Sequence, residues 1–136
     1  MEPILITEEQ LENGVTLRLY DASRKLAGDR WLVALEACAL VPVEENEFME
    51  DDKTGDSFSV RQALGKQISF EQKRERFFID ERQKTAVFNQ MLESFRSSTR
   101  DYLAHPLFPS RFIRQSFRKY LEKKRLDELI NTDRDG

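Results

Sequence analysis

The chain has 136 residues, of which 39% are hydrophobic and 35% are charged, and its formal net charge is −3. This length suits a single domain over residues 1–136, and the ten Phe, three Tyr and one Trp argue against a chain that is disordered throughout. No apolar run approaches the ~18 residues of a membrane span, and the acidic start does not resemble a signal peptide. One Cys and one His cannot form an internal disulfide or a zinc site of the usual Cys/His type. We therefore expect a cytoplasmic protein with no membrane contact, no metal site and no cofactor.

The net charge conceals a strong asymmetry along the chain. Residues 1–60 contain 5 Lys/Arg and 14 Asp/Glu, a balance of −9, whereas residues 61–125 contain 16 and 7, a balance of +9. The last eleven residues contain 1 and 4, a balance of −3. Such asymmetry indicates either an anionic partner or two oppositely charged parts of one fold that neutralise each other.

The first 79 residues predict a small, twisted antiparallel β-sheet that could curl toward a barrel. Apolar and polar residues alternate over 15–21, which predicts a strand with one buried face. Residues 31–43 are apolar on both faces and predict a central strand, and residues 67–79 predict a long antiparallel strand. We expect a short helical turn over 7–14 and an acidic, flexible loop over 44–56.

One acidic residue interrupts the most apolar strand. Glu36 lies among apolar residues, and a buried carboxylate needs a partner. Arg18 on the neighbouring strand is its candidate partner. A Glu36 that faces water near the sheet rim is favoured over a catalytic acid.

The second half, residues 80–130, predicts helices, so the expected fold class is α+β. Phe88, Phe95 and Tyr102 fall within about 40° of one another on a helical wheel. This spacing predicts one long amphipathic helix over 81–104 that packs on the sheet. A proline-containing break at 105–109 then separates it from a second C-terminal helix.

The second helix is expected from Ser110 to at least Lys123 and as far as residue 130. Leu126, Leu129 and Ile130 do not continue its apolar stripe. We therefore expect this end of the helix to kink, to fray or to meet another chain, and these three residues form the candidate self-association site.

A row of arginines is the strongest candidate for ligand binding. Arg111, Arg114, Arg118 and Arg125 project within about 60° of one another on the same helix. Guanidinium groups in such a row can hold phosphates through planar forks of donors, and nearby aromatic rings suit single-stranded nucleic acid. The alternative is a solvated helix flank, or ion pairs with the acidic first half.

The sequence contains no recognisable catalytic constellation. Residues 55–58 resemble the start of the Gly-Asp-Ser nucleophile block of one lipase and esterase family, but His105 follows Asp101 by four residues where that family has an Asp-x-x-His pair. A serine without a histidine base is a weak nucleophile, and the glycine-rich phosphate-binding motifs are absent. We expect a non-enzymatic interaction or regulatory module that binds another protein or itself through its C-terminal helices. The alternative is a nucleic-acid-binding accessory protein that uses the arginine row.

Overall fold

A computed structural model describes residues 2–135 and has a mixed α+β fold. The chain forms two compact units, one from residues 2–40 and 69–108 and the other from residues 41–68 and 109–135. The predicted α+β class is confirmed.

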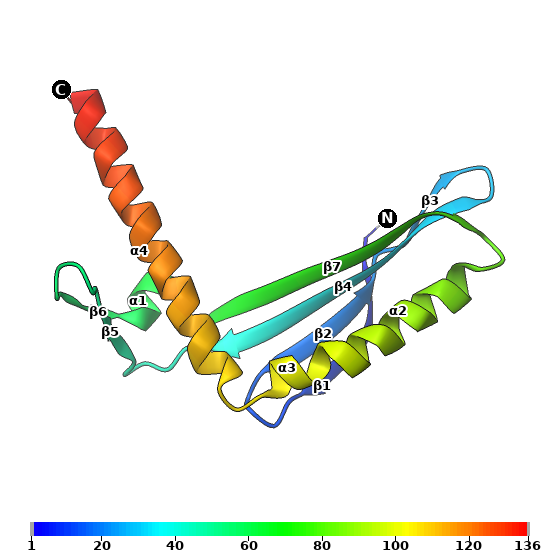
Figure 1. Cartoon of the computed structure of the whole chain (residues 1–136), viewed down its shortest axis with the longest axis horizontal. Helices are drawn as coiled ribbons and strands as arrows, with labels where there is room; N and C mark the ends of the chain where they lie inside the picture. Colours follow the sequence, from blue (N-terminus) through cyan, green and yellow to red (C-terminus); the bar gives the residue numbers. More distant parts are fainter. Residues whose placement is uncertain (1, 136) are drawn as a thin grey trace. The chain divides into compact units, whose positions relative to one another are not determined.

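The first unit is built on an open antiparallel sheet (Figure 1). Its strands are β1 (Ile4–Gln10), β2 (Thr16–Asp21), β3 (Arg24–Ala27), β4 (Arg30–Pro42) and β7 (Gln67–Asp80). The order is β1-β2-β4-β3, and β7 also pairs with β4, so the central place of the most apolar strand is confirmed. The sheet does not close into a barrel among the described residues.

The predicted helical turn over 7–14 is wrong, because this segment contains most of β1 and the turn after it. Leu11 donates its N–H to Val15 O at 2.8 Å, and Gly14 donates to Leu11 O at 3.1 Å. Gly14 has a φ of 90°, a conformation that glycine adopts without steric cost. These contacts reverse the chain, so that β1 pairs with β2 instead of winding into a helix.

One helix covers one face of this sheet (Figure 1). The predicted helix over 81–104 is observed as α2 (Lys84–Ser98) and the short α3 (Arg100–Ala104), separated at Thr99. Phe88, Met91 and Phe95 are buried on α2. They belong to the same core as the alternate side chains of β2 and β4, including Leu17, Leu19, Val33, Leu35 and Ala37.

The partner predicted for Glu36 is also wrong. Arg18 lies directly opposite Glu8 on β1 and binds it, with Nε 2.8 Å from Glu8 Oε2. Glu36 is instead 3.5 Å from Lys73 Nζ on β7. Register decides this outcome, because the residue of β2 opposite Glu36 is Tyr20.

The second unit packs a β-hairpin and two helices. Its elements are β5 (Phe48–Glu50), β6 (Ser57–Ser59), α1 (Val60–Leu64) and α4 (Phe108–Asp135). The segment 44–56, predicted as an unstructured acidic loop, thus contributes one strand and the turn of a hairpin. Burial of apolar side chains from the hairpin, α1 and α4 forms the core, which includes Val43, Val60, Ile113, Phe117 and Leu121.

Helix α4 is longer than predicted and is continuous to Asp135. The sequence predicted that this end kinks, frays or meets another chain. The first two outcomes are not observed, since the helix continues through Leu126, Leu129 and Ile130. Contact with another chain stays a prediction. Pro109 is accommodated because it is the second residue of the helix, where no intrahelical N–H is needed.

Candidate interaction surface

The arginine row lies along α4, and three of its members line one groove. Arg114, Arg118 and Arg125 border a groove of about 550 Å³ between α4 and the β5–β6 hairpin. Arg111 is exposed on the same helix but does not line the groove. The side chains of Arg111, Arg114 and Arg118 make no ion pair among the described residues.

Arg125, in contrast, is held within the unit by Asp51. Its Nη2 donates to Asp51 Oδ1, and Asp51 is only 5% exposed. The same carboxylate oxygen accepts the Lys53 N–H at 3.0 Å. These donors, first the Lys53 amide and then the Arg125 guanidinium, lower the pKa of Asp51 from its ordinary value. The fourth member of the row is therefore a structural tie to the hairpin rather than a free cation.

The hairpin turn is what places Asp51 against α4. Gly55 donates its N–H to Asp51 O at 2.7 Å, and Asp51 donates its own N–H to Asp56 O at 2.8 Å. Gly55 has a φ of 76°, which closes the turn at a position suited to glycine. The backbone of residues 51–56 thus fixes one carboxylate toward the helix.

Both signs of charge line the groove in equal number. Its basic residues are Lys53, Arg114, Arg118 and Arg125, and its acidic residues are Glu50, Asp51, Asp52 and Glu122. Its apolar residues are Phe48, Met49, Phe117 and Leu121. Because four positive charges meet four negative ones, the groove has no net attraction for a polyanion. A floor of apolar side chains with charges of both signs around it resembles the composition of protein–protein contacts.

Beyond the groove, the end of α4 presents an uncovered apolar surface. Leu126, Leu129 and Ile130 are 57%, 63% and 44% exposed, and every residue from 126 to 132 is exposed. We call these three residues the terminal patch. Their spacing of three and four places them within about 100° of one another on the helix, so they form one continuous surface.

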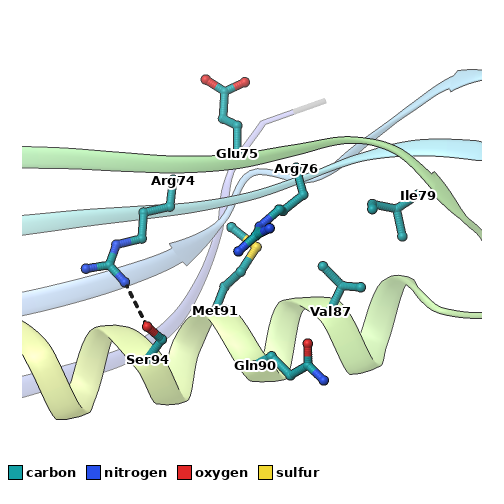
Figure 2. A pocket seen from close by; sticks show the side chains of 8 residues that line it. All are labelled: Arg74, Glu75, Arg76, Ile79, Val87, Gln90, Met91 and Ser94. Carbon is teal, nitrogen blue, oxygen red and sulfur yellow. Dashed lines mark hydrogen bonds between the residues drawn. The ribbon is translucent and has the colours of Figure 1, made fainter.

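A second groove, of about 380 Å³, lies in the first unit between β7 and α2 (Figure 2). Arg74 points from β7 toward α2 and donates to Ser94 Oγ at 3.4 Å, Ser98 Oγ at 3.3 Å and Thr99 Oγ1 at 2.9 Å. Its guanidinium also lies 5.4 Å from the centre of the Phe95 ring. This arginine is fully engaged in fastening the helix to the sheet, so the groove is explained by packing.

The face of the sheet bearing Cys38 also carries charged side chains. Glu36, Glu71 and Lys73 line a shallow depression of about 370 Å³ there together with Tyr20 and Cys38. Burial raises the pKa of the Cys38 thiol above its ordinary value, and a raised pKa makes a thiol less reactive at neutral pH. Cys38 thus behaves as a packing residue.

Ion pairs within each unit neutralise some of the acidic residues of 1–60 with basic residues of 61–125. Acidic residues of 1–60 pair with basic residues of 61–125 in the couples Glu9–Arg100, Glu12–Arg100, Glu36–Lys73, Glu45–Arg61 and Asp51–Arg125. Arg100 binds Glu9 through both Nε and Nη2, which lowers the pKa of Glu9 from its ordinary value. The two oppositely charged parts of the sequence are therefore partly neutralised inside the fold.

Among the residues whose side chains the structure describes, 2–132, no group of three or more His, Cys, Asp and Glu side chains lies together to hold a metal ion. His105 Nδ1 accepts the Leu107 N–H at 3.0 Å in the turn before α4. None of the helices in the described part of the chain is long and apolar enough to cross a membrane.

Comparison with protein-family models, with curated proteins and with solved structures finds no match to this chain.

Sequence reasoning identified the basic side of the groove and the terminal patch but missed the acidic side. Asp51 stands in the run 44–56, and nothing in its composition separates the buried carboxylate from its exposed neighbours. The local signal is Asp51 itself, because an aspartate side chain commonly accepts the N–H two residues on, as Asp51 accepts that of Lys53.

Proposed function

We propose that the protein is a non-enzymatic interaction module that binds another protein through the surface of α4. The observation that carries this proposal is the terminal patch, since three large apolar side chains are exposed side by side on residues 126–132 of α4, all of which are exposed. Isolated exposed leucines are ordinary, whereas a continuous apolar surface on one helix face is typical of a contact site.

The groove supports the same function. Its apolar residues and balanced charges suit a polypeptide, which offers both kinds of group, better than they suit a nucleic-acid backbone. The acidic residues 50–52 of the hairpin line the same groove as Arg114 and Arg118. They repel phosphates that approach these two arginines along the hairpin.

Nucleic-acid binding is the second candidate, and one observation favours it. Arg111, Arg114 and Arg118 are exposed and have no ion-pair partner among the side chains of residues 2–132, so their charges are free for phosphates. Such binding has a clear signature, because a protein that neutralises several phosphates loses affinity by orders of magnitude between about 50 and 200 mM salt. Arg114→Glu with Arg118→Glu would abolish it.

The test of the proposed function is site-specific photocrosslinking in the cells that make the protein. A benzophenone amino acid replaces Leu129, and a matched variant carries it at Asn131, which is also exposed but lies about 160° away around α4. Protein adducts from position 129 that are absent from position 131 and are lost on adding Ile130→Glu support the proposal. Absence of protein adducts from position 129, or adducts only with nucleic acid, contradicts it.

A further inference from the structure

We infer that one end of the first unit binds the surface of an anionic lipid membrane, with Phe77 and Phe78 inserted among the lipid headgroups and nearby basic side chains at the lipid phosphates. The site is separate from the proposed protein-binding surface of α4, because all of its residues belong to the first unit. The expectation of no membrane contact came from the absence of an apolar spanning run. A peripheral contact needs no such run, since it uses a few apolar side chains and cations beside them.

Two turns form this end of the first unit. The β3–β4 turn and the β7–α2 turn lie at the same end of the sheet (Figure 1). Glu81 in the second turn donates its N–H to Asp29 O in the first at 2.9 Å. This bond joins the two turns, so that residues 24–30 and 76–84 form one surface, which we call the basic tip.

A bulge in β7 turns Phe78 out of the core. Side chains two residues apart share one face of a regular strand. Arg74, Arg76 and Ile79 all line the groove beside α2 (Figure 2), so the alternation gains one residue after Arg76. Phe78 is that residue, since its φ of 57° is the left-handed conformation found in bulges. In a regular strand its ring would face α2, but the bulge leaves it 72% exposed.

The backbone at this position does not favour phenylalanine. A left-handed φ is unstrained for glycine and common for asparagine, but it is an outlier for a bulky side chain. The bulge would therefore form more easily with a smaller residue, and what Phe78 adds is its exposed ring. Phe77 beside it is 59% exposed, so two adjacent rings face solvent. Backbone strain that exposes an aromatic ring is typical of a functional position.

Unpaired cations share the basic tip with the two rings. The tip contains six Lys/Arg and three Asp/Glu, a balance of +3. Arg30 pairs with both aspartates, Asp29 at 3.9 Å and Asp80 at 3.1 Å. Four exposed cations of the tip make no ion pair among the side chains of residues 2–132, namely Arg24, Lys25, Arg76 and Arg82. Exposed rings and unpaired cations together complement an anionic membrane, which has an apolar interior beneath a layer of negative charge.

The open face of the sheet argues against a nucleic-acid strand as the occupant. A strand whose bases stack on Phe77 needs cations along the path of its backbone. Phe77 follows Glu75 by two residues, and Glu75 points away from α2 (Figure 2), so both lie on the open face. Beyond the tip this face carries four glutamates against two cations, namely Glu8, Glu36, Glu71 and Glu75 against Arg18 and Lys73. A lipid surface that touches only the basic tip avoids most of these carboxylates.

Flotation of the full chain with lipid vesicles tests the inference. Vesicles of phosphatidylcholine with about 30% phosphatidylserine should bind the chain at least tenfold more tightly than vesicles of phosphatidylcholine alone. Raising sodium chloride from about 100 to 500 mM should weaken the binding. Absence of binding to the phosphatidylserine vesicles, or equal binding to both kinds of vesicle, overturns the inference. Binding of single-stranded RNA through the same two rings, without binding to vesicles, also overturns it and assigns the tip to nucleic acid.

A double variant, Phe77→Thr with Phe78→Asn, separates binding from folding. Thr suits an exposed strand position and Asn tolerates a left-handed φ, so the melting temperature should not fall. Affinity for the phosphatidylserine vesicles should fall at least tenfold. The matched control is Ile6→Thr, which removes a 44% exposed apolar side chain from β1 and should leave vesicle binding unchanged. Full binding by the double variant, or an equal loss in the control, overturns the inference.

A second pair of variants tests the cations of the tip. Arg76→Gln with Arg82→Gln should lower affinity for the phosphatidylserine vesicles at least fivefold. The control removes the same charge from two exposed lysines of α4, as Lys119→Gln with Lys123→Gln, and should have a smaller effect. Equal losses in the two pairs would mean that net charge alone decides binding, which contradicts a contact through the tip.

The orientation of the bound chain gives an independent check. A nitroxide at Ala27→Cys reports the basic tip, and one at Ser97→Cys reports the far end of α2, each in a chain with Cys38→Ala; both labelled positions are exposed. On phosphatidylserine vesicles, the label at position 27 should lose access to a water-soluble nickel complex and the label at position 97 should keep it. Equal protection of both labels, or protection of position 97 alone, contradicts the inference.

Discussion

Replacement of Asn13 tests how the sheet and the helices of the first unit are joined. Its Nδ2 donates to Leu103 O at 2.7 Å and to His105 O at 2.9 Å, and its Oδ1 accepts the Val15 N–H at 3.2 Å. One side chain thus ties the β1–β2 turn to the carbonyl of Leu103 in α3 and to that of His105, the residue that follows the helix.

The cost of removing this side chain follows from its three hydrogen bonds. A net contribution of about 1 kcal/mol each is typical, and the bond to His105 O counts for less because it is exposed to solvent. Asn13→Ala should therefore lower the free energy of unfolding by about 2 kcal/mol. For a chain of this size, that change lowers the melting temperature by about 6–10 °C.

Asn13→Asp is the sharper variant because it keeps the shape of the side chain. It replaces two N–H donors with an anionic oxygen facing two carbonyl oxygens, so it should destabilise the protein more than Asn13→Ala at pH 7. This environment raises the folded-state pKa of the new carboxyl above its unfolded value. A group with a raised folded pKa favours the folded state most when protonated. The difference between the Asp and Ala variants should therefore shrink as the pH falls from 7 toward 4.

Urea unfolding followed by circular dichroism measures both variants. An Asn13→Asp protein as stable as the wild type at pH 7 would refute the assigned hydrogen bonds. A stability gap between the two variants that does not change with pH would refute the electrostatic part of the reasoning.

Three further predictions concern α4 and its groove. The lowered pKa of Asp51 keeps its carboxylate ionised below the usual aspartate range. Its contact with Arg125 should therefore hold as the pH falls to about 4 and be lost only as the pH passes through the lowered pKa. The NMR chemical shift of the Lys53 amide reports this transition. Asp51→Asn should abolish the transition. Phe117 is 2% exposed and its ring centre is 6.0 Å from that of Phe58, so Phe117→Ala should cost about 3–5 kcal/mol in urea unfolding; a loss below about 1 kcal/mol would contradict its place in the core. Leu129→Glu with Ile130→Glu should change the stability of the monomer in dilute solution by less than about 0.5 kcal/mol, because both side chains are exposed; a larger loss would mean that the terminal patch supports the fold of its own chain.

Elements with a clear periodicity could be predicted from the sequence. The alternation over 15–21 and the doubly apolar run over 31–43 are observed as strands. Of the stripe Phe88, Phe95 and Tyr102, the first two are buried on α2, whereas Tyr102 is 59% exposed because it lies on α3, beyond the break at Thr99. The terminal patch could also be found, because Leu126, Leu129 and Ile130 leave the apolar stripe of their helix.

Elements that depend on a distant partner could not be predicted. Residues 4–10 combine a short apolar start with a polar end, and only pairing with β2 makes them a strand. The partner of Glu36 depends on sheet register, since a shift of one residue would exchange the faces of a strand. Asp51 becomes a binding partner for Arg125 only after the hairpin turn brings it to α4. In each case the deciding contact joins residues that no local pattern relates.

The most direct test of the central claim is the photocrosslinking comparison between positions 129 and 131 of α4. Both positions are exposed and only two residues apart, so they differ in the helix face that they report. If the terminal patch is a protein-binding surface, position 129 gives a discrete protein adduct and position 131 does not. Equal labelling from both positions, or none from position 129, would contradict the interaction function.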